Sequence, residues 1–152
     1  MSETKNNIVA VDTSVIVAYL STKKDTQVSK NYIAYLEREL FANETYQNYL
    51  ITSMTKTELL YILCRMKGWD EANEYIEQLL ENFLISRDYE VEDLAALIKC
   101  KFPISLSDCF TLGVGMLFKI PVFFLEEKEL TENIQERIRN ELQIQLHILK
   151  KL

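Results

Sequence analysis

Two short apolar runs, each followed by acidic side chains, constrain the fold of this chain most. The first run leads from Ile8 to Asp12, and the second covers Pro121–Leu125 and is followed by Glu126. A strand with one face in water alternates apolar and polar residues, whereas a strand covered on both faces is apolar throughout. We therefore expect both runs to be strands inside a sheet that has helices on both faces.

Helical patterns separate these strands along the chain. Apolar spacing predicts helices over 15–20, 27–41, 55–66, 69–83, 91–101, 107–118 and 130–141, further strands over 49–52 and 84–86, and an edge strand over 142–149. Strands that alternate with helices of this length are typical of a parallel sheet. The predicted fold is α/β, with three α/β/α layers and a mostly parallel central sheet.

The chain is predicted to be a single domain over residues 1–152, because it has only three glycines and two prolines and lacks a linker-like run. A domain of this size buries roughly 68–70% of its unfolded surface, so it needs no disulfide or zinc to fold. Cys64, Cys100 and Cys109 are widely spaced and have apolar neighbours. We interpret them as small core residues of a protein in a reducing compartment.

Net charge and the apolar stretches bear on location and partners. The formal charge is −6, the wrong sign for a protein that grips nucleic acid with its whole surface. Either nucleic acid is not the ligand, or acids gather around cations while a local basic patch makes the contact. No signal peptide is evident, and every apolar stretch is shorter than the ~20 residues of a membrane span. We expect a cytoplasmic protein without a membrane segment.

Acidic residues recur near the ends of strands and the starts of helices. They are Asp12, Glu58, Asp108 and the pair Glu126 and Glu127. The carboxyl ends of parallel strands share one edge of a sheet, where ligands bind, so these acids are expected to converge there.

Each acid also has a purely structural explanation. Asp12 suits an N-cap, Thr55 and Glu58 have the spacing of a capping box, and Ser105 and Asp108 share that spacing. Glu126 and Glu127 suit a helix dipole.

Electrostatics favours a metal site over this structural explanation if the acids do converge. Clustered carboxylates repel one another and raise each other's pKa values, so a cation must offset their charge at neutral pH. Oxygen ligands without clustered His or Cys select Mg²⁺ or Mn²⁺. Such ions activate water and offset charge on the leaving oxygen when phosphodiesters are hydrolysed.

Three segments resemble motifs of the PIN domain family. The stretch from Ile8 through Asp12-Thr-Ser14 resembles its opening strand, Thr55-Lys-Thr-Glu58 resembles the helix with the second acid, and Ile104-Ser-Leu-Ser-Asp108 resembles the segment with the third. The resemblance covers about residues 7–130 in the expected order.

The resemblance implies that Asp12, Glu58 and Asp108 bind metal and that Ser14 orients a ligand or water beside Asp12. The family's last motif, Thr-x-Asp, aligns here with Leu125-Glu126-Glu127. Glu127 then takes the position of the last acid, with Glu126 as the alternative, and Leu125 offers no hydroxyl.

The resemblance leads to three functional hypotheses. The first is a metal-dependent endoribonuclease that uses Mg²⁺ or Mn²⁺, like the small VapC-type toxins that pair with an antitoxin and form homodimers. The second is a binding or scaffold protein with a weakened site, and the third is a solitary PIN nuclease that acts in RNA maturation.

Two further features have competing interpretations. The tyrosines of the first third, together with nearby lysines, suit either base stacking on RNA or packing between helices and subunits. A second group of cations suits either phosphate contacts or a solvated surface: Lys128, Arg137, Arg139, Lys150 and Lys151. The lone histidine, His147, is interpreted as a surface residue or a hydrogen-bonded core residue and not as a catalytic base.

Overall fold

The computed structural model describes residues 7–87 and 89–152, and these residues contain one five-stranded sheet. Its strand order is β3-β2-β1-β4-β5, and every neighbouring pair is parallel. The strands are β1 (Ile8–Val11), β2 (Asn48–Thr52), β3 (Phe83–Ser86), β4 (Val122–Leu125) and β5 (Leu146–Leu149).

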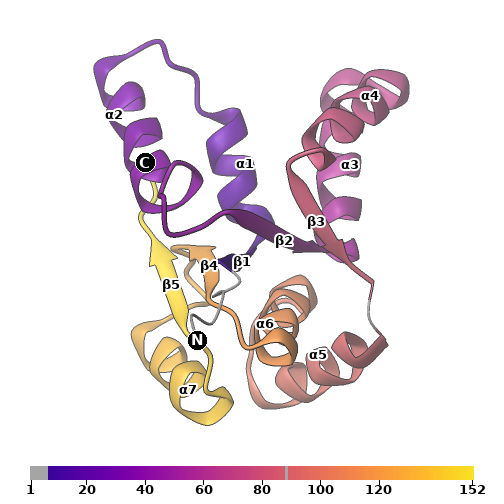
Figure 1. Cartoon of the computed structure of the whole chain (residues 1–152), viewed down its shortest axis with the longest axis vertical. Coiled ribbons are helices and arrows are strands. Elements are labelled where there is room, and N and C mark those ends of the chain that lie inside the picture. Colours follow the sequence, from indigo (N-terminus) through magenta and orange to yellow (C-terminus); the bar gives the residue numbers. More distant parts are fainter. Residues whose placement is uncertain (1–6, 88) are drawn as a thin grey trace, which may run out of the picture.

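Helices cover both faces of this sheet, as Figure 1 shows. One face carries α1 (Thr13–Ser21), α2 (Gln27–Leu36), α3 (Ser53–Lys67) and α4 (Trp69–Leu80), with a π-helical turn, η1 (Glu37–Phe41), after α2. The other face carries α5 (Tyr89–Lys101), α6 (Leu106–Phe118) and α7 (Glu132–Leu142). The predicted three-layer fold around a parallel sheet is confirmed.

Alternation of side chains along the central strands builds a separate core on each face. In β1, Val9 and Val11 join the core under α1 and α2, whereas Ala10 joins the core over α5, α6 and α7. In β4, Phe123 and Phe124 divide in the same way. Both faces of these strands are buried, which is why β1 and β4 are apolar at every position. Burial of each large apolar side chain contributes about 1.5–3 kcal/mol to the stability of the folded state.

A glycine lets α6 lie directly on the sheet. A Cβ added at Gly115 would lie 2.2 Å from Cγ2 of Val122 in β4, far inside van der Waals contact. A larger residue would push α6 off β4. Because Asp108 lies in the first turn of α6, this close approach also fixes the position of that acid.

Some predicted boundaries are wrong. The helix predicted over 69–83 ends at Leu80, and Phe83 begins β3, where pairing with β2 outweighs its helical spacing. The edge strand predicted over 142–149 starts only at Leu146, because α7 continues to Leu142 and Gln143 ends it with a left-handed φ of 53°.

The cysteines differ in exposure. Cys109 is buried and Cys64 is partly buried, whereas Cys100 is exposed on α5, so its interpretation as a core residue is wrong. Within residues 7–87 and 89–152, no helix has both the length and the apolar character that a membrane crossing requires.

The strand order reverses at β1. The chain leaves β1 toward β2 and β3 on one side and later adds β4 and β5 on the other. Ligands of open parallel sheets bind beyond the carboxyl ends of the strands at such a switch point. Here this point lies between the ends of β1 and β4.

Candidate metal centre

A hollow of about 430 Å³ lies at this switch point. Its lining comes from the ends of β1 and β4, from α1, α3 and α6, and from the segment after β5. Its polar side chains are those of Asp12, Thr13, Ser14, Glu58, Ser105, Ser107, Asp108, Glu127 and Lys151. Of the acids predicted from the sequence, Glu126 alone is missing from this lining.

Asp12 follows β1 and caps α1. Its Oδ2 accepts hydrogen bonds from the backbone N–H of Ser14 at 3.1 Å and from Ser14 Oγ at 2.7 Å. Its Oδ1 accepts a bond of 3.2 Å from Oγ1 of Thr111 in α6. The N-cap interpretation is therefore correct, and the same carboxylate also faces the hollow, where it is only 2% exposed.

Asp108 lies in the first turn of α6 and is 4% exposed. Its backbone N–H donates to the N-cap, Ser105 Oγ, at 3.1 Å. The cap therefore uses the main chain of Asp108 and leaves the carboxylate available. Among the described residues, its Oδ2 is buried and lacks a hydrogen-bond partner, which is costly for a carboxylate.

Three carboxylates meet in the hollow. One oxygen each from Asp12, Asp108 and Glu127 lies within 4.8 Å of the other two. Burial first, and then the charges of Asp12 and Glu127, raise the pKa of Asp108 to about 8. Burial also raises the pKa of Asp12, against the hydrogen bonds from Ser14 and Thr111. Burial and repulsion by Asp12 raise the pKa of Glu127.

Glu58 reaches the hollow from α3. Its Oε1 accepts hydrogen bonds from Thr13 Oγ1 at 2.8 Å and from Ser107 Oγ. The capping-box interpretation is wrong, because the N-cap of α3 is Thr52. Two hydroxyls therefore hold Glu58 in the hollow. Glu58 is not one of the three acids whose oxygens lie within 4.8 Å of one another.

These residues suit a hard divalent cation. The donors are carboxylate oxygens, one of them buried without a partner, and the described lining contains neither His nor Cys. Such a set favours Mg²⁺ or Mn²⁺ over zinc. A cation between the three carboxylates would offset the repulsion that raises their pKa values.

Comparison with known families agrees with this geometry. The model of the PIN domain matches residues 9–136. The chain belongs to the PIN domain family. PIN domains are typically nucleases. The match contains all of the acids that line the hollow and excludes the segment after β5, which carries Lys151.

Solved structures share the fold of this PIN domain at low sequence identity. VapBC2 from Rickettsia felis, bound to a DNA fragment from its promoter, has a TM-score of 0.59 and 18% identity, covering 93% of this chain and 98% of that one. DNA-bound VapBC from Salmonella typhimurium has a TM-score of 0.61 and 14% identity, covering 92% and 96%.

A third solved structure is a toxin alone. VapC20 from Mycobacterium tuberculosis, a toxin that cleaves the sarcin-ricin loop, has a TM-score of 0.56 and 16% identity, covering 84% of this chain and 93% of that one. No curated protein matches the chain by sequence.

Of the two candidates for the last acid, Glu127 lines the hollow with Asp12 and Asp108. Glu126 is exposed and does not line the hollow, and its backbone N–H donates to Leu149 O at 2.8 Å. The structure therefore does not bring Glu126 into the hollow. The helix-dipole interpretation of both acids is wrong, because α7 begins only at Glu132.

Apart from Ser14, the sequence did not single out the hydroxyls that hold the acids. Thr111 lies three residues after Asp108, so both share a helix face, and this spacing was the available signal. Ser107 is next to Asp108 but bonds to Glu58. Thr13 stands out in the sequence only as part of the opening motif. Of the second group of cations, Lys151 alone lines the hollow.

The tyrosines and His147 pack inside the fold. Tyr19 donates to Glu37 at 2.9 Å, and Tyr49 donates to the carbonyl oxygens of Leu40 and Phe41, each at 3.1 Å. These bonds support the packing interpretation. The ring of His147 stacks on Phe123 with 4.6 Å between centroids, and burial lowers its pKa.

Proposed function

We propose that this PIN domain is a metal-dependent endoribonuclease that hydrolyses phosphodiester bonds of RNA. One observation carries the proposal: the buried carboxylates of Asp12 and Asp108 converge with the partly buried carboxylate of Glu127, and Asp108 holds an oxygen that no described group satisfies. A fold that needed these acids only as helix caps would not bring them together against their mutual repulsion. A divalent cation at this point would offset the repulsion between the carboxylates and would give the unpaired oxygen of Asp108 a partner.

Each residue has a distinct proposed role. Asp12, Asp108 and Glu127 hold one or two Mg²⁺ or Mn²⁺ ions, which supply Lewis acidity for the attacking water and the leaving oxygen. Ser14 and Thr111 donate to Asp12 and hold its carboxylate in place.

Glu58, fixed by Thr13 and Ser107, acts beside the three carboxylates. It orients the attacking water or completes the coordination of a second ion.

Cleavage of a mixed pool of single-stranded RNA tests this proposal. Cleavage with Mg²⁺ or Mn²⁺ should stop in EDTA and in Asp108→Asn, whereas Glu126→Gln, a change of the same charge outside the hollow, should cleave like the wild type. Cleavage that survives in Asp108→Asn would show that the site is misplaced. If folded wild-type protein cleaves neither the pool nor structured RNAs, the result would favour the second hypothesis, a weakened binding protein, or an enzyme selective for one RNA.

We further propose that the chain is the toxin of a toxin–antitoxin pair. The VapBC complexes among the structural neighbours support this role. An apolar hollow between α1 and α3 offers a surface for a partner helix; it is lined in part by Leu20, Leu59 and Met66, and Met66 is 68% exposed.

A toxin should have a neighbouring small gene whose product co-purifies with it and blocks cleavage. The absence of such a gene would favour the third hypothesis, a solitary nuclease in RNA maturation. The predicted homodimer is tested by light scattering of the purified chain.

A further inference from the structure

The segment after β5 brings a cation to the acidic hollow. Among the described residues that line the hollow, Lys151 is the one lysine or arginine. Its charge lowers the pKa of Glu127, opposing the effects of burial and of Asp12. Lys151 is exposed and forms no ion pair in the described part of the chain. Its ammonium group is therefore near the acids and still available to a ligand.

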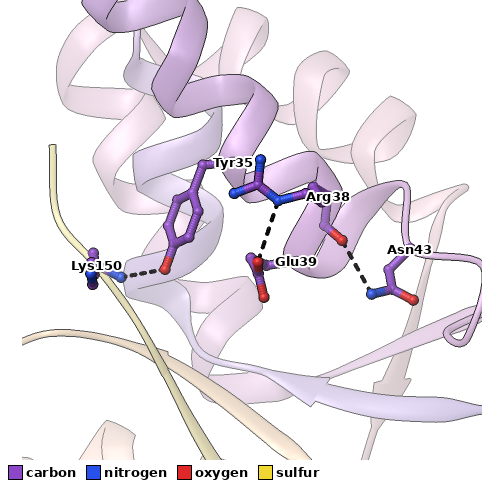
Figure 2. A network of polar contacts seen from close by, with 5 residues as sticks. All are labelled: Tyr35, Arg38, Glu39, Asn43 and Lys150. Carbon is purple, nitrogen blue, oxygen red and sulfur yellow. Dashed lines mark hydrogen bonds and ion pairs between the residues drawn. The ribbon is translucent and has the colours of Figure 1, made fainter.

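Two tyrosines of α2 hold the residue before Lys151 by its main chain. Tyr32 donates to the carbonyl oxygen of Lys150 at 2.9 Å, and the N–H of Lys150 donates to Tyr35 Oη at 3.0 Å, the bond drawn in Figure 2. Their rings stack with 6.1 Å between centroids. Because the backbone N–H and the backbone carbonyl of Lys150 are both hydrogen-bonded, the direction in which the chain continues to Lys151 is fixed.

Three polar residues, Arg38, Glu39 and Asn43, form a network beside Tyr35. The guanidinium of Arg38 lies over the ring of Tyr35, 5.7 Å from its centroid, and pairs with Glu39 at 3.5 Å. Asn43 donates to the carbonyl oxygen of Arg38 at 3.1 Å, as Figure 2 shows. An exposed network of this kind contributes little to stability. Within it, Arg38 is the residue that contacts the ring of Tyr35.

The cation and the last acid are also linked through the backbone. The N–H of Glu126 donates to the carbonyl oxygen of Leu149 at 2.8 Å. This bond joins the loop that carries Glu127 to the end of the strand that precedes Lys151. Displacement of either backbone segment from the other would break this hydrogen bond.

We propose that Lys151 binds a backbone phosphate of RNA at the edge of the metal centre and that Tyr32 and Tyr35 position it there. This inference rests on the proposed function. A chain of net charge −6 repels a polyanion, and a site of several carboxylates repels it most. A lysine at that site supplies a point charge for phosphate that opposes this repulsion locally.

RNA binding without cleavage tests the role of Lys151. The Asp108→Asn protein provides the background, and the dissociation constant of a fluorescent single-stranded RNA is measured in Mg²⁺ at several salt concentrations. Lys151→Gln should weaken binding roughly three- to tenfold and reduce the salt slope by about 0.7, the contribution of one phosphate contact. Lys128→Gln, with the same charge change outside the hollow, should stay within about twofold.

A double-mutant cycle tests the positioning by the tyrosines. Tyr32→Phe combined with Tyr35→Phe should weaken binding when Lys151 is present and should have no further effect in Lys151→Gln. Tyr35→Phe alone gives the same comparison if the combined variant does not fold. Equal losses in both backgrounds would mean that the tyrosines do not act through Lys151.

The outcomes separate this inference from the proposed function. Cleavage by the wild type with equal RNA binding by Lys151→Gln and Lys128→Gln would overturn the inference alone. A changed affinity for Mn²⁺ with an unchanged salt slope would also overturn it, since Lys151 would then only offset the charge of Glu127. RNA binding that depends on Lys151, without cleavage by the wild type, would overturn the proposed nuclease and leave the phosphate contact standing.

Discussion

Replacing Asp108 by asparagine should stabilise the metal-free protein while abolishing its activity. The pKa of Asp108 is raised from 3.8 to about 8 by burial and by the charges of Asp12 and Glu127. At pH 7 the unfolded chain has lost this proton, whereas the folded chain keeps most of it. Because pH 7 lies about three units above the ordinary pKa of 3.8, the raised pKa costs the folded state at most about 4 kcal/mol at this pH. Asparagine has nearly the same shape and no such cost.

The net gain is smaller because a buried carboxamide leaves some hydrogen bonds unmade, at about 1–3 kcal/mol. A net stabilisation of about 1–3 kcal/mol corresponds to a rise in Tm of roughly 3–10 °C for a chain of this length. The stability difference between the variant and the wild type depends on pH. A raised acid pKa costs the wild type nothing below about pH 4, and the cost grows until the pH passes about 8. The advantage of the variant should follow that course.

Thermal unfolding in EDTA at pH 4, 6 and 8 measures this effect. Glu126→Gln, which removes an exposed acid outside the hollow, is the matched control and should show no such trend. Mn²⁺ at one hundred times its dissociation constant should add about 2.7 kcal/mol to the wild type and little to the variant. A variant no more stable than the wild type at pH 8 would refute the argument that repulsion and burial strain this site.

Three further predictions concern packing and metal binding. Gly115→Ala should lower the free energy of unfolding, measured by urea denaturation, by about 1–3 kcal/mol through overpacking. The control is Gly113→Ala, whose added Cβ would meet its nearest neighbour at 3.3 Å and which should cost less. Equal losses would contradict the close approach of α6 to β4. Glu127→Gln should weaken Mn²⁺ binding at least about tenfold in calorimetry, and Glu126→Gln should not; the reverse order would exchange their roles. Mn²⁺ affinity of the wild type should rise from pH 6 to pH 8, because the ion displaces protons from acids such as Asp108; a flat profile would contradict the raised pKa values.

The central strands and the acids after them could be predicted because both follow from local sequence. A strand buried on both faces must be apolar throughout, and the runs before Asp12 and Glu126 meet this condition. The positions of the acids followed from the rule that parallel strands end at one edge. Phe83 shows the limit of such reasoning, since its spacing fits a helix and only pairing with β2 makes it a strand.

The details of the site depend on contacts between distant segments. Thr55 and Glu58 have the spacing of a cap, but Thr52 caps α3, and Glu58 instead accepts from Ser107, 49 residues away. Nothing in the local sequence distinguishes these two arrangements. Lys151 reaches the hollow only because α2 holds its neighbour, Lys150, across 118 residues. A pattern within one segment cannot reveal such a pairing.

The position of a bound cation tests the central claim most directly. Crystals grown with Mn²⁺ should give an anomalous difference peak between Asp12, Asp108 and Glu127, with carboxylate oxygens at roughly 2.0–2.3 Å, as oxygen ligands of hard cations lie. The peak should disappear in Asp108→Asn crystals grown in the same way. A peak elsewhere, or none at this point in well-ordered wild-type crystals, would contradict the claim that these acids form a metal centre.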